Sequence, residues 1–83
     1  MKNIGLFFLL LILALAIPEA TFAQKELKRA NKLLKNDAYC EAIGPYNIYL
    51  EKFIDKKALV NRGRCFYHCN DLEKSLTDFE NAR

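Results

Sequence analysis

The chain has few of the residues on which enzyme active sites depend. Its 83 residues include only one histidine and three glycines. The sequence contains no Gly-rich loop that would cradle a phosphate. It also has no Ser or Cys in a convincing arrangement with His and Asp, as nucleophilic catalysis requires. Because a single small domain leaves little room for a substrate cleft, we expect no enzymatic activity and no cofactor.

Charge of one sign is not in large excess either. The formal net charge is +3, and the chain lacks a dense basic patch and basic residues interleaved with aromatics, so we expect no nucleic-acid binding. It also lacks an Asn-x-Ser/Thr glycosylation site that would indicate a eukaryotic secretory route. The charges are nevertheless sorted, because residues 25–35 and 56–69 are mainly basic whereas residues 71–80 are mainly acidic.

An apolar run opens the chain and has the features of a signal peptide. A lysine precedes it, residues 4–17 are almost wholly apolar, and Thr21 and Ala23 supply the small residues of a cleavage site. We therefore predict export to the bacterial periplasm or envelope, or secretion. The signal peptide and the mature domain would cover residues 1–23 and 24–83. An uncleaved membrane anchor is the alternative, although the run is shorter than the roughly 20 residues that span a bilayer.

Apolar residues of the mature domain recur at intervals of three and four, as one face of a helix requires. This spacing predicts helices over residues 24–34, 39–53 and 58–69 and a fourth after Asn70. Asp37 and Asn70 are the predicted N-caps of the second and fourth helices, and residues 55–56 are the predicted turn before the third. Gly44 and Pro45 lie inside the second helix, where we expect a bend or a loosened turn but no division into two helices.

A pattern of large and small residues returns after 33 positions. The first copy is Tyr39, Glu41, Ala42, Ile43 and Tyr46, and the second is Leu72, Lys74, Ser75, Leu76 and Phe79. Self-similarity at such a period is typical of stacked helical hairpins, and these usually bind other proteins.

These residues resemble the tetratricopeptide repeat. The second helix of that repeat carries a large residue, then Glu-Ala-Ile, then an aromatic; here Tyr39-Cys40-Glu41-Ala42-Ile43 is followed by Tyr46. A further repeat is indicated by three segments that resemble the same family pattern, namely Asn61-Arg62-Gly63, Phe66-Tyr67 and residues 70–76. Ala30 and Gly63 match the small residues at which helices of the family touch. The resemblance covers the mature domain. It implies an all-α fold of antiparallel helix-turn-helix hairpins, a right-handed α-solenoid fragment with repeats at about residues 24–55 and 56–83.

The resemblance also implies a scaffold for protein–protein interaction. The first helix of each repeat would line a concave face with Leu27, Asn31, Leu34, Lys35, Lys57, Val60, Asn61, Arg64, Tyr67 and His68. We expect this basic face to hold a peptide or protein segment, favouring acidic ones, through Asn31, Lys35, Lys57, Asn61, Arg64 and Tyr67. Some family members clamp a terminal carboxylate, but Leu27 stands where that clamp needs lysine. The alternative reading of the basic residues is a solvated helix face.

The array is short for its type. Repeats of this kind need about three units and polar caps to be stable alone, and two are present. Phe66, Leu76 and Phe79 are expected at an uncovered edge. Self-association is therefore an alternative function, in which a structural or assembly module pairs through an apolar helix face. An N-terminal fragment of a larger envelope protein is another alternative, by analogy of fold.

The cysteines leave several arrangements open. Three is an odd number, so in an oxidising compartment at least one stays unpaired within the chain. Cys40 opens the second predicted helix and Cys69 closes the third, and antiparallel neighbours bring those ends to one level, which permits a Cys40–Cys69 disulfide. Free cysteines acting as small core residues are the competing interpretation. A thiol or metal site could use Cys40, Cys65, His68 and Cys69, but ligands from one helical turn rarely surround a metal, so we expect no metal.

Overall fold

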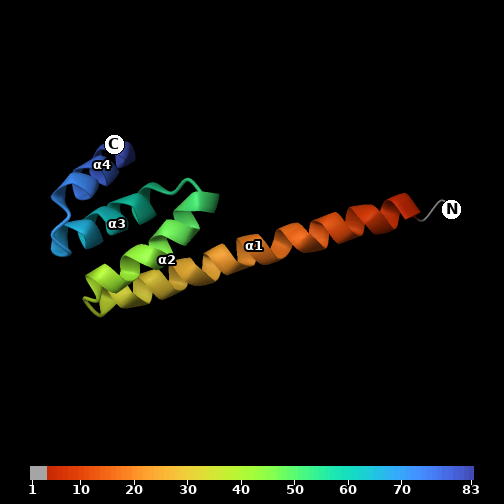
Figure 1. Ribbon diagram of the computed structural model, residues 1–83, viewed down its shortest axis with the longest axis horizontal. Helices are drawn as coiled ribbons and strands as arrows, with labels where there is room; N and C mark the ends of the chain where they lie inside the picture. Colours follow the sequence, from red (N-terminus) through yellow and green to blue (C-terminus); the bar gives the residue numbers. More distant parts are fainter. Residues whose placement is uncertain (1–3) are drawn as a thin grey trace.

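Four helices make up the part of the chain that this computed structural model describes, which is the backbone of residues 4–83 and the side chains of residues 19–83. They are α1 (Ile4–Lys35), α2 (Tyr39–Lys52), α3 (Lys56–His68) and α4 (Leu72–Ala82), and no strand occurs among these described residues. Figure 1 shows two hairpins, α1–α2 and α3–α4, with α3 lying between α2 and α4. The fold is all-α, as the helical periodicity predicts.

The first helix is longer than the sequence pattern predicts. α1 begins at Ile4 instead of residue 24, because the apolar run and the amphipathic segment that follows join in one helix. Leucine and alanine, which are strong helix formers, lie on both sides of the junction. The predicted cleavage point after Ala23 therefore lies inside α1, and Ala23 is part of the buried core. Within residues 19–83, whose side chains the structure describes, no helix combines the length and apolarity needed to cross a membrane.

The turns after α1 and α3 share one backbone conformation, which shows that the N-cap predictions for Asp37 and Asn70 are wrong. Both residues have a positive φ, of 60° and 67°, and end the preceding helix. In each turn the amide of the next residue closes onto a carbonyl of that helix at 2.8 Å, as in a Schellman motif. Asp and Asn tolerate the left-handed conformation better than most residues do, which explains their presence there.

Aspartates cap α3 and α4, and the cap of α4 lies one position after the predicted Asn70. The Asp55 carboxylate accepts a hydrogen bond from the Ala58 amide (3.1 Å), and the Asp71 carboxylate accepts one from the Lys74 amide (3.2 Å). Lys56, predicted to lie in the turn, is the first residue of α3. Each cap satisfies a backbone donor that the first helical turn leaves without a partner.

The core lies where α2 packs between α1 and α3. Pro45 does not divide α2 into two helices, which confirms that part of the prediction, and the Tyr46 side chain of α2 is fully buried. The alanines Ala30, Ala42 and Ala58 are buried with it, which lets the helices approach closely. Half-buried apolar side chains complete the core, namely Leu27, Leu33, Leu34, Tyr39, Ile43, Leu50 and Phe53.

α3 and α4 approach each other closely at a glycine. A Cβ atom at Gly63 would lie only 2.7 Å from the Phe79 ring, so no larger residue fits there without a shift. The Ser75 hydroxyl, which is buried, donates a hydrogen bond to the Gly63 carbonyl (2.8 Å). The small residues that the repeat pattern places at these two positions therefore bring the helices of the second hairpin together.

A buried ion pair joins three helices. The Arg62 guanidinium of α3 donates two hydrogen bonds to the Asp78 carboxylate of α4 (2.8 and 2.7 Å) and a third to the Asn47 side chain of α2 (3.0 Å). The Asp78 carboxylate is almost fully buried. Arg62 therefore acts in packing, although the sequence suggests only that it belongs to an unopposed basic segment.

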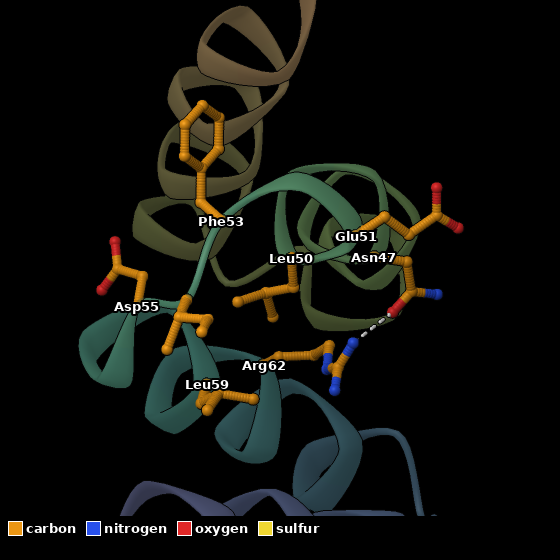
Figure 2. A pocket seen from close by; sticks show the side chains of 8 residues that line it. Asn47, Leu50, Glu51, Phe53, Asp55, Leu59 and Arg62 are labelled. Atoms are coloured by element: carbon orange, nitrogen blue, oxygen red, sulfur yellow. Dashed lines mark hydrogen bonds between the residues drawn. The ribbon is translucent and has the colours of Figure 1, made fainter. Parts of the chain in front are cut away.

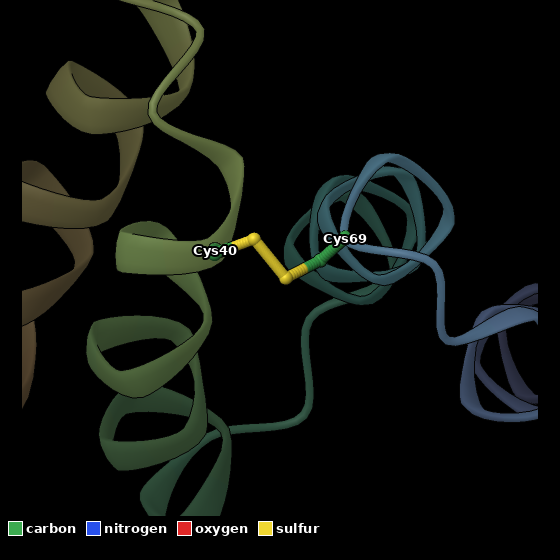
Figure 3. Close-up of a disulfide and its surroundings, with 2 residues drawn as sticks. All are labelled: Cys40 and Cys69. Atoms are coloured by element: carbon green, nitrogen blue, oxygen red, sulfur yellow. A yellow bond between two sulfur atoms is a disulfide. The ribbon is translucent and has the colours of Figure 1, made fainter.

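A disulfide between Cys40 and Cys69 joins the two hairpins (Figure 3). Cys40 lies in the first turn of α2, and Cys69 directly follows α3. Their Cα atoms are 5.4 Å apart, because the two helices are antiparallel and these ends lie at one level. Cys65 is a free, buried cysteine, and burial raises the pKa of its thiol. The structure thus combines the disulfide with one small core cysteine.

Candidate peptide-binding face

The six residues that the sequence assigns to ligand binding come from α1 and α3. We call them the basic face: Asn31 and Lys35 of α1, and Lys57, Asn61, Arg64 and Tyr67 of α3. Five of them are exposed and Asn61 is half-buried. Residues 57, 61 and 64 recur at intervals of four and three, so the helix geometry alone places them on one side of α3.

A buried tyrosine of α2 binds one of the two asparagines and lies near the other. The Tyr46 hydroxyl donates a hydrogen bond of 2.6 Å to the Asn31 side-chain oxygen. Burial raises the pKa of Tyr46 to about 12, and the Asn61 side chain beside the same hydroxyl acts in the opposite direction. Because its oxygen is turned toward Tyr46, the Asn31 amide points its NH2 group away from that hydroxyl. Tyr46 therefore fixes the Asn31 amide of α1 in the neighbourhood of Asn61 of α3.

Some cations of the described chain have an ion-pair partner and others do not. Arg29, Lys52, Arg62 and Lys74 each lie within ion-pair distance of a carboxylate. Among the residues that the structure describes, no such pair involves Lys35, Lys57 or Arg64. An acidic ligand would therefore meet cations that break no ion pair to bind it, although Lys57 lies near enough to Asp55 to help lower the pKa of that carboxyl.

Aromatic rings surround the C-terminal end of α3. His68 stacks on Tyr39 with ring centroids 4.0 Å apart, and Tyr67 meets His68 edge to face at 5.3 Å. The Tyr39 hydroxyl donates to the Asp37 carboxylate (3.0 Å), and this hydrogen bond is the main cause of a raised pKa of Tyr39. These contacts hold His68 against α2. Tyr67 remains 57% exposed and offers a ring to a ligand.

The structure does not support the thiol or metal site that would use Cys40, Cys65, His68 and Cys69. Cys40 and Cys69 are consumed by the disulfide and are not free thiolates. Within the described residues, no group of three or more His, Cys, Asp or Glu side chains is placed to hold a metal ion. The raised pKa of the buried Cys65 thiol also disfavours the reactive thiolate form.

A concave region outside the basic face lies between the C-terminal end of α2 and α3 (Figure 2). Leu50, Phe53 and Leu59 form part of its wall. Most of its polar groups are already engaged, because Arg62 binds Asn47 and Asp78 and the Asp55 carboxylate caps α3, whereas Glu51 is exposed. Tyr49 also donates to Asp55 (2.8 Å), and this hydrogen bond is the main reason that the pKa of Asp55 is lowered. The pocket therefore offers less to a polar ligand than the basic face does.

Comparison of the chain with protein-family models, curated proteins and solved structures found no match. The resemblance to the tetratricopeptide repeat therefore depends on the residues themselves. The helical hairpins described above are compatible with it and are not specific to it.

Sequence reasoning missed three contacts of this region. It did not foresee the Tyr46–Asn31 hydrogen bond, the stacking of His68 on Tyr39, or the pairing of Arg62 with Asp78. The stacking had a signal, because Tyr39 and His68 are neighbours of the two cysteines and lie at the same ends of antiparallel helices. Nothing in the sequence indicated the pairing of Arg62 with Asp78, because these residues are 16 positions apart and lie on different helices.

Proposed function

We propose that this chain is an exported, tetratricopeptide-repeat-like interaction module whose basic face binds an acidic peptide or protein segment. The observation that carries the proposal is the Asn31 amide held by the Tyr46 hydroxyl, on a face that also carries Asn61 and exposed cations that form no ion pair among the described residues. Amides can bind the backbone of an extended or helical segment, and the cations attract its carboxylates. Binding, not catalysis, is the role that these groups serve.

Each residue of the face has a distinct part in this proposal. Lys57 and Arg64 supply charge from α3, and Lys35 supplies it from the end of α1. Asn31 and Asn61 donate hydrogen bonds, and the exposed Tyr67 ring stacks on apolar or planar groups of the ligand. The ligand would therefore combine acidic with apolar residues.

The test begins with peptide display against the full chain in mild detergent micelles. An enriched peptide is then titrated against the wild type and the Lys57→Glu/Arg64→Glu variant. We expect the variant to bind at least about tenfold more weakly, and raised salt to weaken wild-type binding, because the attraction is electrostatic.

The matched control is Lys25→Glu/Lys32→Glu. It reverses two exposed lysines of α1 with the same seven-residue spacing, and neither lysine is one of the six residues of the basic face. We expect its binding to stay near that of the wild type. Equal losses in both variants would mean that only net charge matters, and no loss in either would show that the basic face is not the binding site.

A second candidate function is assembly through α4. Leu72 and Leu76, on its outer side, are 58% and 63% exposed. Large apolar side chains grouped on one helix face favour an interaction site. This face is distinct from the basic face.

A further inference from the structure

The outer side of α4 lacks a neighbour that α2 has at the equivalent positions. Tyr39 and Ile43 of α2 are half-buried, and Tyr46 is fully buried, where α3 packs on them. Their counterparts 33 positions later are Leu72, Leu76 and Phe79. The two leucines are more than half exposed, and Phe79 is only partly buried. Figure 1 shows why, because α4 lies at the end of the stack with nothing beyond it.

Acidic side chains flank this apolar stripe. Glu73 and Glu80 are exposed and lie seven residues apart, with Leu76 between them on the same side of α4. Asp78, by contrast, points into the hairpin and is held by Arg62. A surface that docks here must therefore carry both apolar groups and cations.

The exposed side of α3 has the complementary pattern. Lys57 and Arg64 also lie seven residues apart, with Val60 between them and 39% exposed. Seven residues of helix span about 10.5 Å, so both acid–base pairs can form at once when α4 lies along such a surface. If α4 of one copy runs parallel to α3 of another, residues 16 positions apart in the sequence lie side by side. Glu73 then lies beside Lys57, Leu76 beside Val60, and Glu80 beside Arg64.

The two complementary stripes are adjacent on the molecule. Tyr67 of α3 and Leu72 of α4 line one shallow pocket together with His68 and Asn70. The α3–α4 hairpin therefore presents a basic helix side next to an acidic one. A two-fold rotation places the basic side of one copy against the acidic side of the other, which is the self-complementarity that a symmetric dimer requires.

We infer that the outer side of α4 docks on the exposed side of α3 in a second copy of this chain, and that the two copies exchange this contact reciprocally. The inference depends on the proposed function, since it names α4 as an acidic, apolar segment that the basic face binds. Lys57 and Arg64 meet Glu73 and Glu80 of the second copy, and Leu76 packs near Val60 of that copy.

Two other pairings within a dimer are less favourable. An antiparallel α4–α4 contact brings Glu73 of one copy near Glu80 of the other, and like charges repel. In the other pairing, α1 of a second copy would pack on the outer side of α4 in the way that α3 packs on α2 within one chain. This packing would bury lysines. Lys25 and Lys32 occupy the α1 positions that correspond to the buried Ala58 and Cys65 of α3.

The test uses two charge-reversed variants of the full chain, in mild detergent micelles present in large excess over protein. The basic variant is Lys57→Glu/Arg64→Glu, and the acidic variant is Glu73→Lys/Glu80→Lys. Sedimentation measures the dimer dissociation constant, and circular dichroism checks that each variant keeps its helices. Each variant alone carries like charges across the contact, so we expect dimerisation at least about tenfold weaker than in the wild type.

Mixing the two variants is the decisive step. Opposite charges then face each other again at both reciprocal contacts, so a one-to-one complex of near wild-type affinity is expected. A variant that failed for lack of folding would not recover in this way. The Lys25→Glu/Lys32→Glu control should dimerise as the wild type does.

Three outcomes would overturn the inference. They are a wild type that stays monomeric up to about 1 mM, dimerisation that survives either reversal, and a mixture that does not associate. A monomeric wild type that still binds acidic peptides through Lys57 and Arg64 would reject this inference alone. Absence of both dimer and peptide binding would reject the proposed function with it.

Discussion

The ion pair between Arg62 and Asp78 gives the sharpest prediction for stability. Replacing Arg62→Ala removes both hydrogen bonds to a carboxylate whose side chain is only 4% exposed, and also the bond to Asn47. Breaking a buried pair typically costs about 3–5 kcal/mol, because the remaining charge is buried without a partner. Since the Arg62 side chain is itself 21% exposed, water can reach part of the site, and we expect about 3 kcal/mol.

This loss is large for so short a chain. At roughly 0.05–0.15 kcal/mol per residue, the total free energy of unfolding is about 4–12 kcal/mol. The assay is urea unfolding of the oxidised full chain, followed by circular dichroism. The control is Lys52→Ala, which breaks an exposed pair with Glu19 at 3.4 Å and should cost less than about 1 kcal/mol.

A double replacement separates burial of charge from loss of packing. Arg62→Met/Asp78→Leu removes both charges and fills the site with apolar atoms, so it should recover much of the stability lost in Arg62→Ala. The reasoning fails if Arg62→Ala costs no more than Lys52→Ala. It fails equally if the double variant is less stable than the single one.

Three further predictions follow from the core. Reduction of the Cys40–Cys69 bridge, which closes a loop over a separation of 29 residues, should lower the free energy of unfolding by about 3.5 kcal/mol, as measured by urea titration with and without reductant. Gly63→Ala should destabilise by about 1–3 kcal/mol, because its Cβ would meet the Phe79 ring at 2.7 Å, and Phe79→Leu should offset part of that loss. The pKa of Tyr46, raised to about 12, keeps the hydroxyl neutral in the folded state. Its contribution to stability is full below the usual tyrosine pKa near 10 and is lost as the pH rises to about 12, which chemical unfolding over this range will show when compared with Tyr46→Phe.

Helical periodicity was sufficient to predict the α-helical class and the approximate extents of α2 and α3. The turns were harder, because Asp and Asn serve both as N-caps and as left-handed residues that end a helix. Asp37 and Asn70 take the second role, and only the backbone geometry distinguishes the two. The predicted start of α1 at residue 24 was wrong, because a predicted cleavage site does not by itself interrupt a helix.

The sequence could predict the candidate site only for residues that lie on a single helix. Spacing along α3 is enough to place Lys57, Asn61 and Arg64 on one side, and it requires no knowledge of the other helices. The hydrogen bond between Tyr46 and Asn31 depends on how α1 and α2 pack, and the role of Arg62 as a packing residue depends on how α2, α3 and α4 pack. No local pattern carries that information.

The position of the disulfide has a mechanical consequence. A pull applied to the two ends of the chain passes from Cys40 to Cys69 through the sulfur–sulfur bond, and the chain between them carries no load (Figure 3). Only α1 and α4 can then be peeled away by tension, while α2 and α3 are shielded. The bridge spans 29 residues, so about 100 Å of extended chain, at roughly 3.5 Å per residue, stays inextensible until the bond is reduced.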